Sequence, residues 1–278
     1  MSIESLEIPL ASTDGHQFPL LARVPAQAQA ALLWLPALGV AAKHYLPFAE
    51  ELAAHGVAVF VHEWRGNGGS DLRPDRDHDW GYRELLTLDL PASHAAMAQR
   101  IPQLPLLVGG HSLGGQLAAC YAALHPAAFA QLWLVATGTP YWRSFPAPRR
   151  WLLPLFYRFA PWLADRRGRL NGRRLGFGGM EARGLIRDWA RVGLSNRYAA
   201  AGLDMDLEAA LARLSIPVHG VLFEQDWLAP QGSLDALLAR LAPAQRKLIA
   251  LNQRQLGTRA DHFAWMKQPL SVVECLLE

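Results

Sequence analysis

The 278-residue sequence has little of what several protein classes need. Its only two cysteines, Cys120 and Cys275, lie in no CxxC or other metal-like spacing, so neither a disulfide framework nor a cysteine metal site is expected. The longest apolar run, residues 30–42, contains Pro36 and Gly39 and is too short to span a bilayer. The N-terminal segment carries early acids and no basic stretch followed by an apolar core, unlike a signal peptide. These absences predict a cytoplasmic protein.

Apolar, strand-like runs alternate with helical patterns along the chain. A turn signal at residues 13–15 predicts an opening hairpin. Further buried strands are expected at 30–37, 57–64, 103–110, 131–137, 217–223 and 246–252, and helical patterns at 45–56, 84–101 and 113–126. This alternation predicts an α/β fold with a mostly parallel sheet that is covered by helices on both faces.

Ser112 stands between two glycine pairs in the stretch 107–115, "LVGGHSLGG". A serine among glycines can simply cap a helix at a strand-to-helix turn. Here an apolar run precedes the serine and an apolar helical pattern follows it, which is the setting of a nucleophile elbow. Gly110 and Gly114 lack the Cβ atoms that would clash where strand and helix close around a strained serine. The pattern predicts that the Ser112 hydroxyl points into a cleft as a nucleophile.

A serine nucleophile needs a histidine base and a carboxylate that orients this base. Of the ten histidines, His262 has the right position, because it follows the last expected strand in a loop before the final helix. Asp226 directly follows the strand expected at 217–223, so its side chain should emerge at the same sheet edge as Ser112. Glu224, two residues earlier, is the competing acid.

The segment 141–200 differs in composition from the rest of the chain. It holds thirteen arginines, no lysine and three acids, a formal charge of +10, whereas the whole chain is +3. Together with its many aromatics, this predicts a core at 1–139 and 214–278, interrupted by a helical cap at 140–213. The arginines are either the solvated face of this cap or a surface that steers anionic substrates or touches anionic lipid headgroups. No nucleic-acid-binding module is recognisable, so no such partner is expected.

The order serine, acid, histidine, with an insertion between the strands at 131–137 and 217–223, resembles the α/β-hydrolase superfamily. Within this superfamily, the stretches 36–71, 89–92 and 175–198 are similar to a bacterial group of predicted hydrolases of serine-aminopeptidase or lysophospholipase-like type. The resemblance covers nearly the whole chain. It implies a roughly eight-stranded sheet with a small helical cap.

The resemblance also implies that the backbone N–H groups of Leu113 and Leu38 form an oxyanion hole. The sequence departs from the family pattern at two places. Pro36 and Ala37 stand where many relatives have His-Gly, and Glu63 stands where an aspartate is usual. The residue at the Glu63 position is ordinarily structural, and neither departure removes a predicted catalytic residue.

These residues predict a serine hydrolase that forms an acyl-enzyme. His262 would deprotonate Ser112, which attacks a carbonyl carbon, while Asp226 orients His262. No metal or organic cofactor is expected. A short-chain or medium-chain carboxylic ester is the leading substrate, followed by a long-chain lipid or lysophospholipid. Thioesters, amides and carbon–carbon bonds stay open, since the same triad serves them all. The alternative from another class is a non-catalytic, ligand-binding protein of this fold.

Aromatic side chains in the cap and beside the predicted catalytic residues are candidates for contact with an apolar acyl group. For each of them the competing interpretation is packing between cap and sheet. The candidates for substrate contact are His111, Trp142, Trp189, Trp227 and Trp265.

Overall fold

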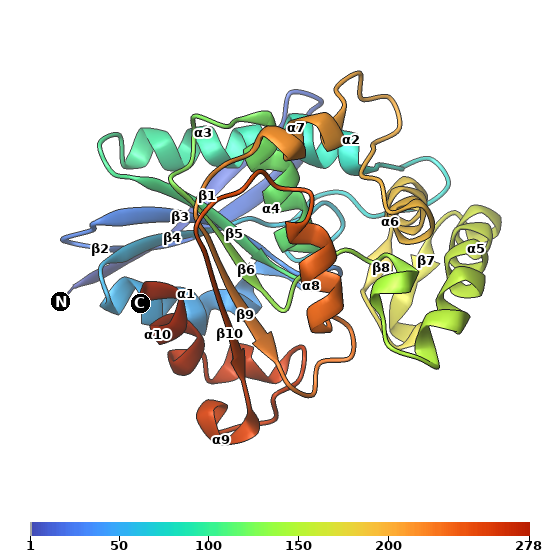
Figure 1. The fold of residues 1–278 in the computed structure, drawn as a ribbon. Helices are drawn as coiled ribbons and strands as arrows, with labels where there is room; N and C mark the ends of the chain where they lie inside the picture. The colour runs from blue at the N-terminus through green and yellow to red at the C-terminus, as the bar shows by residue number, and fades with distance from the viewer. Residues whose placement is uncertain (1) are drawn as a thin grey trace.

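A computed structural model describes residues 2–278 as an eight-stranded sheet with helices around it (Figure 1). The spatial order of the strands is β1-β2-β4-β3-β5-β6-β9-β10. Strand β2 pairs antiparallel with β1 and β4, and every pair from β4 to β10 is parallel. The predicted α/β fold with a mostly parallel sheet is confirmed. The strands are β1 (Ile3–Ala11), β2 (Gln17–Pro25), β3 (Ala30–Leu35), β4 (Val57–Val61), β5 (Leu106–His111), β6 (Gln131–Val135), β9 (Val218–Phe223) and β10 (Arg246–Leu251).

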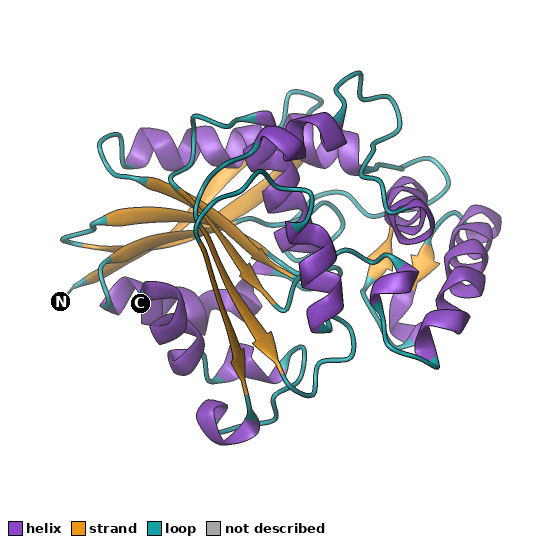
Figure 2. Ribbon diagram, in the orientation of Figure 1, coloured by secondary structure: helices purple, strands orange, loops and turns teal. Residues whose placement is uncertain are grey.

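Helices cover both faces of the sheet (Figure 2). One face packs against α1 (Leu46–Ala54) and α10 (Leu270–Leu277). The opposite face packs against α3 (Leu90–Arg100), α4 (Leu113–Leu124), α7 (Leu207–Arg213) and α8 (Gln231–Leu238). Side chains of a strand alternate between the two faces. Leu32 and Trp34 therefore pack on the face covered by α1 and α10, whereas Leu33 and Leu35 pack on the face covered by α4. Burial on both faces explains why the strands read as continuous apolar runs.

The helical pattern expected at 84–101 is divided in the structure. It consists of α2 (Tyr82–Glu84), a π-helical turn (Leu85–Asp89) and α3. Pro91 lacks the N–H group that a continuous α-helix would donate to the carbonyl oxygen four residues earlier, so the wider turn lies directly before it.

An insertion connects β6 to β9 and lies beyond one end of the sheet in Figure 1. It has a small core of its own, formed by Ala160, Ala164, Leu170 and Ile186. Helix α7 packs back against α4. We propose that residues 140–213 form the cap and that α7 returns the chain to the sheet. The cap elements are a 3₁₀ turn (Trp142–Ser144), α5 (Arg149–Arg167), β7 (Leu170–Asn171), a second 3₁₀ turn (Gly172–Leu175), β8 (Met180–Glu181) and α6 (Arg183–Ser195).

Two shorter helical segments lie near the carboxyl end. They are α9 (Gln253–Leu256) and a 3₁₀ turn (Ala264–Lys267). Among the helices of residues 2–278, none combines the length and the apolar character that a membrane crossing needs.

Glu63, one of the two departures from the family pattern, is buried after β4. Its carboxyl oxygens accept hydrogen bonds from the backbone N–H of Ala42 (3.1 Å) and Gly69 (3.4 Å). A Cβ atom at Gly68 would lie 1.8 Å from a Glu63 oxygen, so the longer side chain is accommodated by a glycine. Burial raises the pKa of Glu63 to about 7.

This raised pKa predicts a pH-dependent stability difference between the wild type and Glu63→Gln. The folded state holds the Glu63 proton more tightly than the unfolded chain, and this tighter binding adds to the free energy of unfolding. The added free energy is complete below pH 4.5 and is lost as the pH rises through about 7. Between pH 5 and 8, we expect the free energy of unfolding of the wild type to fall by up to about 3 kcal/mol relative to that of the variant. Urea unfolding of both proteins at each pH measures the difference.

The comparison has to be made against the variant, because other buried groups act in the opposite direction. Burial lowers the pKa of His62 to about 3. Through this group the free energy of unfolding rises with pH up to about 6.5, over part of the same range. His62 is present in both proteins, so its effect cancels in the difference. Glu274→Gln, which makes the same chemical change at an exposed carboxylate, is the matched control. A difference between wild type and Glu63→Gln that does not change with pH would contradict the prediction.

Candidate active site

Ser112 lies between the end of β5 and the start of α4 and has a strained backbone, with φ 56° and ψ −120°. Positive φ is rare for a residue with a side chain and marks a sharp turn. A Cβ atom at Gly110 would lie 2.4 Å from the carbonyl carbon of Gly114, and one at Gly114 would lie 2.0 Å from the carbonyl oxygen of Leu35. Strand and helix can therefore close around Ser112 only with glycines at these positions, as the sequence predicts.

His262 and Asp226 are in direct contact, although 36 residues separate them. The Nδ1 atom of His262 lies 2.7 Å from Asp226 Oδ2, and both residues are 5% exposed. The other carboxylate oxygen, Oδ1, accepts the backbone N–H of Leu228 (2.8 Å) and Ala229 (3.1 Å). The carboxylate is thus held by its own loop, and Nε2 is the ring nitrogen of His262 that stays available.

Ser112 and His262 line the same cavity. No hydrogen bond joins the two side chains in the part of the chain that the structure describes. In ligand-free enzymes the bond between nucleophile and base is often long and shortens only when substrate is bound.

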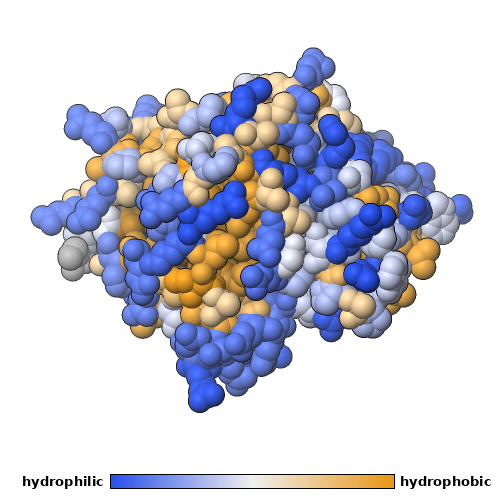
Figure 3. All heavy atoms as spheres, viewed as in Figure 1, coloured by the Kyte–Doolittle hydropathy of each residue, from blue (hydrophilic) through white to orange (hydrophobic). Residues whose placement is uncertain are grey.

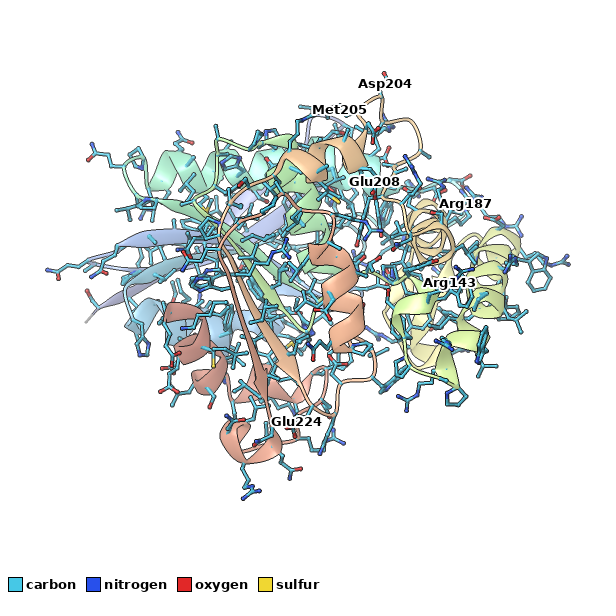
Figure 4. The ribbon with its side chains drawn as sticks, viewed as in Figure 1. Arg143, Arg187, Asp204, Met205, Glu208 and Glu224 are labelled. Carbon is cyan, nitrogen blue, oxygen red and sulfur yellow. The ribbon has the colours of Figure 1, made fainter. Side chains whose placement is uncertain are left out.

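The competing acid, Glu224, lies elsewhere. Its side chain is exposed and borders a separate surface depression with Gln225, Asn252 and Gln253. Figure 4 shows Glu224 at the end of β9, close to α9 and far from the cap. Of the two candidate acids, Asp226 is therefore the one that contacts His262.

Leu38 and Leu113, the residues implied as oxyanion donors, both line the cavity beside Ser112. Among residues 2–278, neither backbone N–H has a hydrogen-bond partner. The N–H of Leu113 is the first of helix α4, where the helix dipole adds partial positive charge. Two free N–H groups beside one serine can stabilise an oxyanion.

Tyr45 holds the loop of Leu38 in place and is a residue that sequence reasoning missed. Its hydroxyl accepts the backbone N–H of Ala37 (2.9 Å) and lies 2.8 Å from His111 Nδ1. Tyr45 thereby connects the loop after β3 with the residue that precedes Ser112. No local pattern could reveal this role, since the three residues meet only in the folded chain.

The cap supports the same loop from the other side. A Cβ atom at Gly39 would lie 2.0 Å from the backbone nitrogen of Gly179, so the two backbones are in close contact. Glu181 accepts the N–H of Gly179 at 2.6 Å, and burial raises the pKa of Glu181 to about 7. Leu38 also packs against the small core of the cap. The sequence indicated no contact between these two segments.

The cavity has a volume of about 570 Å³ and lies between the sheet and the cap. Most of its lining is apolar, and the cap contributes Leu153, Phe156, Tyr157, Phe177 and Trp189 to it. The polar residues that line it from the core include Gln116 and Thr139. A cavity of this size and character suits an apolar group of a small ligand.

The structure divides the five candidates for substrate contact. Trp189 and Trp227 line the cavity, whereas His111, Trp142 and Trp265 do not. Trp265 is fully buried and packs against His111, at 5.4 Å between ring centroids. Burial lowers the pKa of His111 well below its ordinary value. Trp142 lies on the cap beside Trp151. Sequence reasoning could not separate these roles, because it does not show which side of a core an aromatic ring faces.

A second serine, histidine and aspartate set has the hydrogen-bond pattern of a triad but lies away from the cavity. His16 Nε2 lies 2.9 Å from Ser70 Oγ, and His16 Nδ1 lies 3.1 Å from Asp89 Oδ1. Arg65 binds both oxygens of Asp89, at 2.6 and 2.8 Å. All three members are at most 5% exposed. This set joins the opening hairpin to the loop after β4 and offers a natural control for Ser112.

Comparisons with known proteins agree with the fold. Residues 26–253 match the family model described as serine aminopeptidase S33. No curated protein matches the sequence. A hydrolase from Pseudomonas aeruginosa superimposes with a TM-score of 0.65 at 18% identity, over 99% of this chain and 97% of the other.

Two further solved structures are similar over their length. Est1E from Butyrivibrio proteoclasticus, solved with ferulic acid bound, has a TM-score of 0.64 at 16% identity, over 96% of this chain and 97% of the other. A bacterial membrane phospholipase A, described as a virulence factor, has a TM-score of 0.62 at 18% identity, over 99% and 84%. At these identities the likeness concerns the fold.

Proposed function

The chain belongs to the serine aminopeptidase S33 family of α/β hydrolases, and we propose that it is a serine hydrolase acting on carboxylic esters. One observation carries the proposal: a strained serine and a histidine that is paired with a buried aspartate line one apolar cavity. A serine becomes a nucleophile at neutral pH only when such a base accepts its proton.

The mechanism has two halves. His262 Nε2 takes the proton of the Ser112 hydroxyl while Oγ forms a bond to the carbonyl carbon, and the N–H groups of Leu38 and Leu113 stabilise the oxyanion. The carbon–oxygen bond to the leaving alcohol then breaks, and the alcohol leaves with the proton from His262. Water repeats the sequence on the acyl-enzyme and releases the acid. Asp226 orients the imidazole and stabilises its protonated form throughout.

The apolar lining of the cavity favours an ester with an apolar acyl or aromatic group. The esterase from Butyrivibrio proteoclasticus holds ferulic acid, an aromatic acid, and the phospholipase neighbour is named for lipid esters. Both support an ester of apolar character for this chain. The second candidate is a lipid ester, which the outer surface of the cap favours.

Mass spectrometry after exposure to a fluorophosphonate tests the proposal. We expect a single adduct on the native protein and on Ser70→Ala, and none on Ser112→Ala, since only Ser112 lies in the cavity with an aspartate-paired base. A p-nitrophenyl ester series of increasing chain length then measures the reach of the cavity.

The Ser70→Ala variant makes the labelling result specific. Ser70 also has a histidine and an aspartate in line, so labelling at Ser70 would show that bonding pattern alone creates reactivity. A folded native protein without an adduct would refute the serine hydrolase and support a non-catalytic, ligand-binding protein of this fold.

A further inference from the structure

The outer face of α5 carries an exposed apolar stripe. Of the twelve large hydrophobic residues that are exposed in the described chain, five lie on this helix and are 45% to 67% exposed. They recur every one to four residues, so they share one side of the helix, whereas Tyr157, Ala160 and Ala164 face the protein. We call this surface the α5 stripe; its members are Trp151, Leu152, Leu155, Phe159 and Trp162.

Arginines surround the α5 stripe and lie against its aromatic rings. The guanidinium of Arg150 lies 4.7 Å from the ring centre of Trp151, and that of Arg166 lies 5.5 Å from the ring centre of Trp162. Arg158 is exposed on the same helix. Long arginine side chains keep their charge in water while their stems cover apolar surface. This is the composition of a helix at a membrane interface, with aromatics and leucines in the apolar zone and cations at headgroup level.

Most of this positive charge is unpaired. Of the thirteen arginines between residues 141 and 200, only three form ion pairs with a carboxylate in the described part of the chain: Arg183, Arg187 and Arg191. Figure 4 shows Arg143 and Arg187 on the outside of the cap, and Figure 3 shows hydrophilic residues there with hydrophobic ones among them. Ten cations thus remain for an anionic partner.

The α5 stripe continues to the mouth of the cavity. Leu152 is both 66% exposed and part of the cavity lining. Trp227 and Phe263, which line the cavity from the core, are 50% and 40% exposed. The guanidinium of Arg149 lies 5.1 Å from the Trp227 ring centre and connects cap and core at this point. A surface that covers the stripe therefore borders the opening of the site.

We infer that α5 docks on the surface of an anionic lipid bilayer, with the α5 stripe in the interface and the surrounding arginines on lipid phosphates. A second copy of the chain is the competing occupant, but two copies of segment 141–200, each with a formal charge of +10, repel one another. Anionic headgroups instead neutralise this charge. Docking in this way presents the cavity mouth to the lipids, so the substrate is an ester drawn from the bilayer; this last step rests on the proposed function.

Sedimentation with lipid vesicles tests the docking. We expect the wild type to bind vesicles of phosphatidylcholine and phosphatidylglycerol at low salt, and pure phosphatidylcholine vesicles far more weakly. The combined variant Leu155→Ser, Phe159→Ser and Trp162→Ser should bind about a hundred-fold more weakly, and Arg158→Glu with Arg166→Glu should lose the preference for anionic vesicles. None of these five residues lines the cavity.

The control replaces exposed apolar residues on another helix. Leu270 and Leu277 of α10 are 48% and 38% exposed and lie on the core, so their combined change to serine should leave vesicle binding unchanged. A wild type that stays in the supernatant, or a stripe variant that still sediments, would overturn the inference. A dimer in light scattering that dissociates when the stripe is replaced would show that a second copy covers it, and would overturn it too.

Parallel assays separate this inference from the proposed function. The stripe variant should hydrolyse a short-chain p-nitrophenyl ester at the wild-type rate but hydrolyse esters in anionic vesicles at a greatly reduced rate. Ser112→Ala should bind vesicles as the wild type does. Ester hydrolysis without vesicle binding would contradict only the docking inference. Vesicle binding without any adduct or hydrolysis would contradict only the proposed function.

Discussion

Replacement of Ser112 with alanine is expected to lower kcat for ester hydrolysis by roughly 10⁵-fold or more, because no other group can form the acyl-enzyme. Loss of a serine nucleophile leaves only the contribution of the oxyanion donors and of substrate binding, which are backbone groups and apolar walls here. KM should change little, since Oγ contributes little to ground-state binding. Steady-state kinetics with a short-chain ester, over a range that includes saturation, measures both quantities.

Ser112→Gly is a second inactive variant with a different effect on stability. Glycine adopts φ 56° without strain, so the free energy of unfolding of this variant should be about 1 kcal/mol higher than that of Ser112→Ala. The pair shows that loss of activity comes from the missing hydroxyl and not from a damaged turn. Substantial activity in both variants would exclude Ser112 as the nucleophile.

Asp226→Asn is expected to lower kcat by roughly 10⁴-fold while leaving the fold intact. The asparagine amide can occupy the place of the carboxylate, but its NH₂ group would favour the wrong tautomer of His262, with the proton on Nε2. His262 could then no longer accept the proton of Ser112. Steady-state kinetics and the time course of fluorophosphonate labelling measure the effect. The rate of ester hydrolysis and the rate of labelling should fall together.

Glu224→Gln is the control for this variant, since it makes the same chemical change two residues away. Glu224 is exposed and does not contact His262, so its replacement should leave kcat within about two-fold of the wild type, as expected for a surface change. If Asp226→Asn retained activity and Glu224→Gln lost it, the orienting acid would be Glu224.

In the proposed mechanism, the contact between the cap and the loop of Leu38 connects substrate binding with the reacting centre. Leu38 packs on the cap core, and Gly39 meets Gly179 backbone to backbone. A shift of the cap would therefore move the N–H of Leu38 relative to Ser112. In our proposal, a membrane that binds α5 acts on the same structural unit that holds this donor.

The parts of the site that depend on neighbours in the sequence could be predicted from it. Gly110, Ser112 and Gly114 lie within a few residues of one another, so their spacing predicts the sharp turn. Asp226 and His262 each follow an expected strand, so their places at the sheet edge could be predicted as well. The mostly parallel sheet follows from apolar runs because burial on both faces removes the alternation of a half-exposed strand.

The tertiary structure decided what depends on which way a side chain points. It placed Asp226 rather than Glu224 against His262, and it buried Trp265 while Trp227 came to line the cavity. It also brought Tyr45 into contact with both Ala37, 8 positions earlier, and His111, 66 positions later. The physical reason is that the sequence determines which residues must leave water, whereas the choice of neighbour depends on strand order and helix packing across the whole chain.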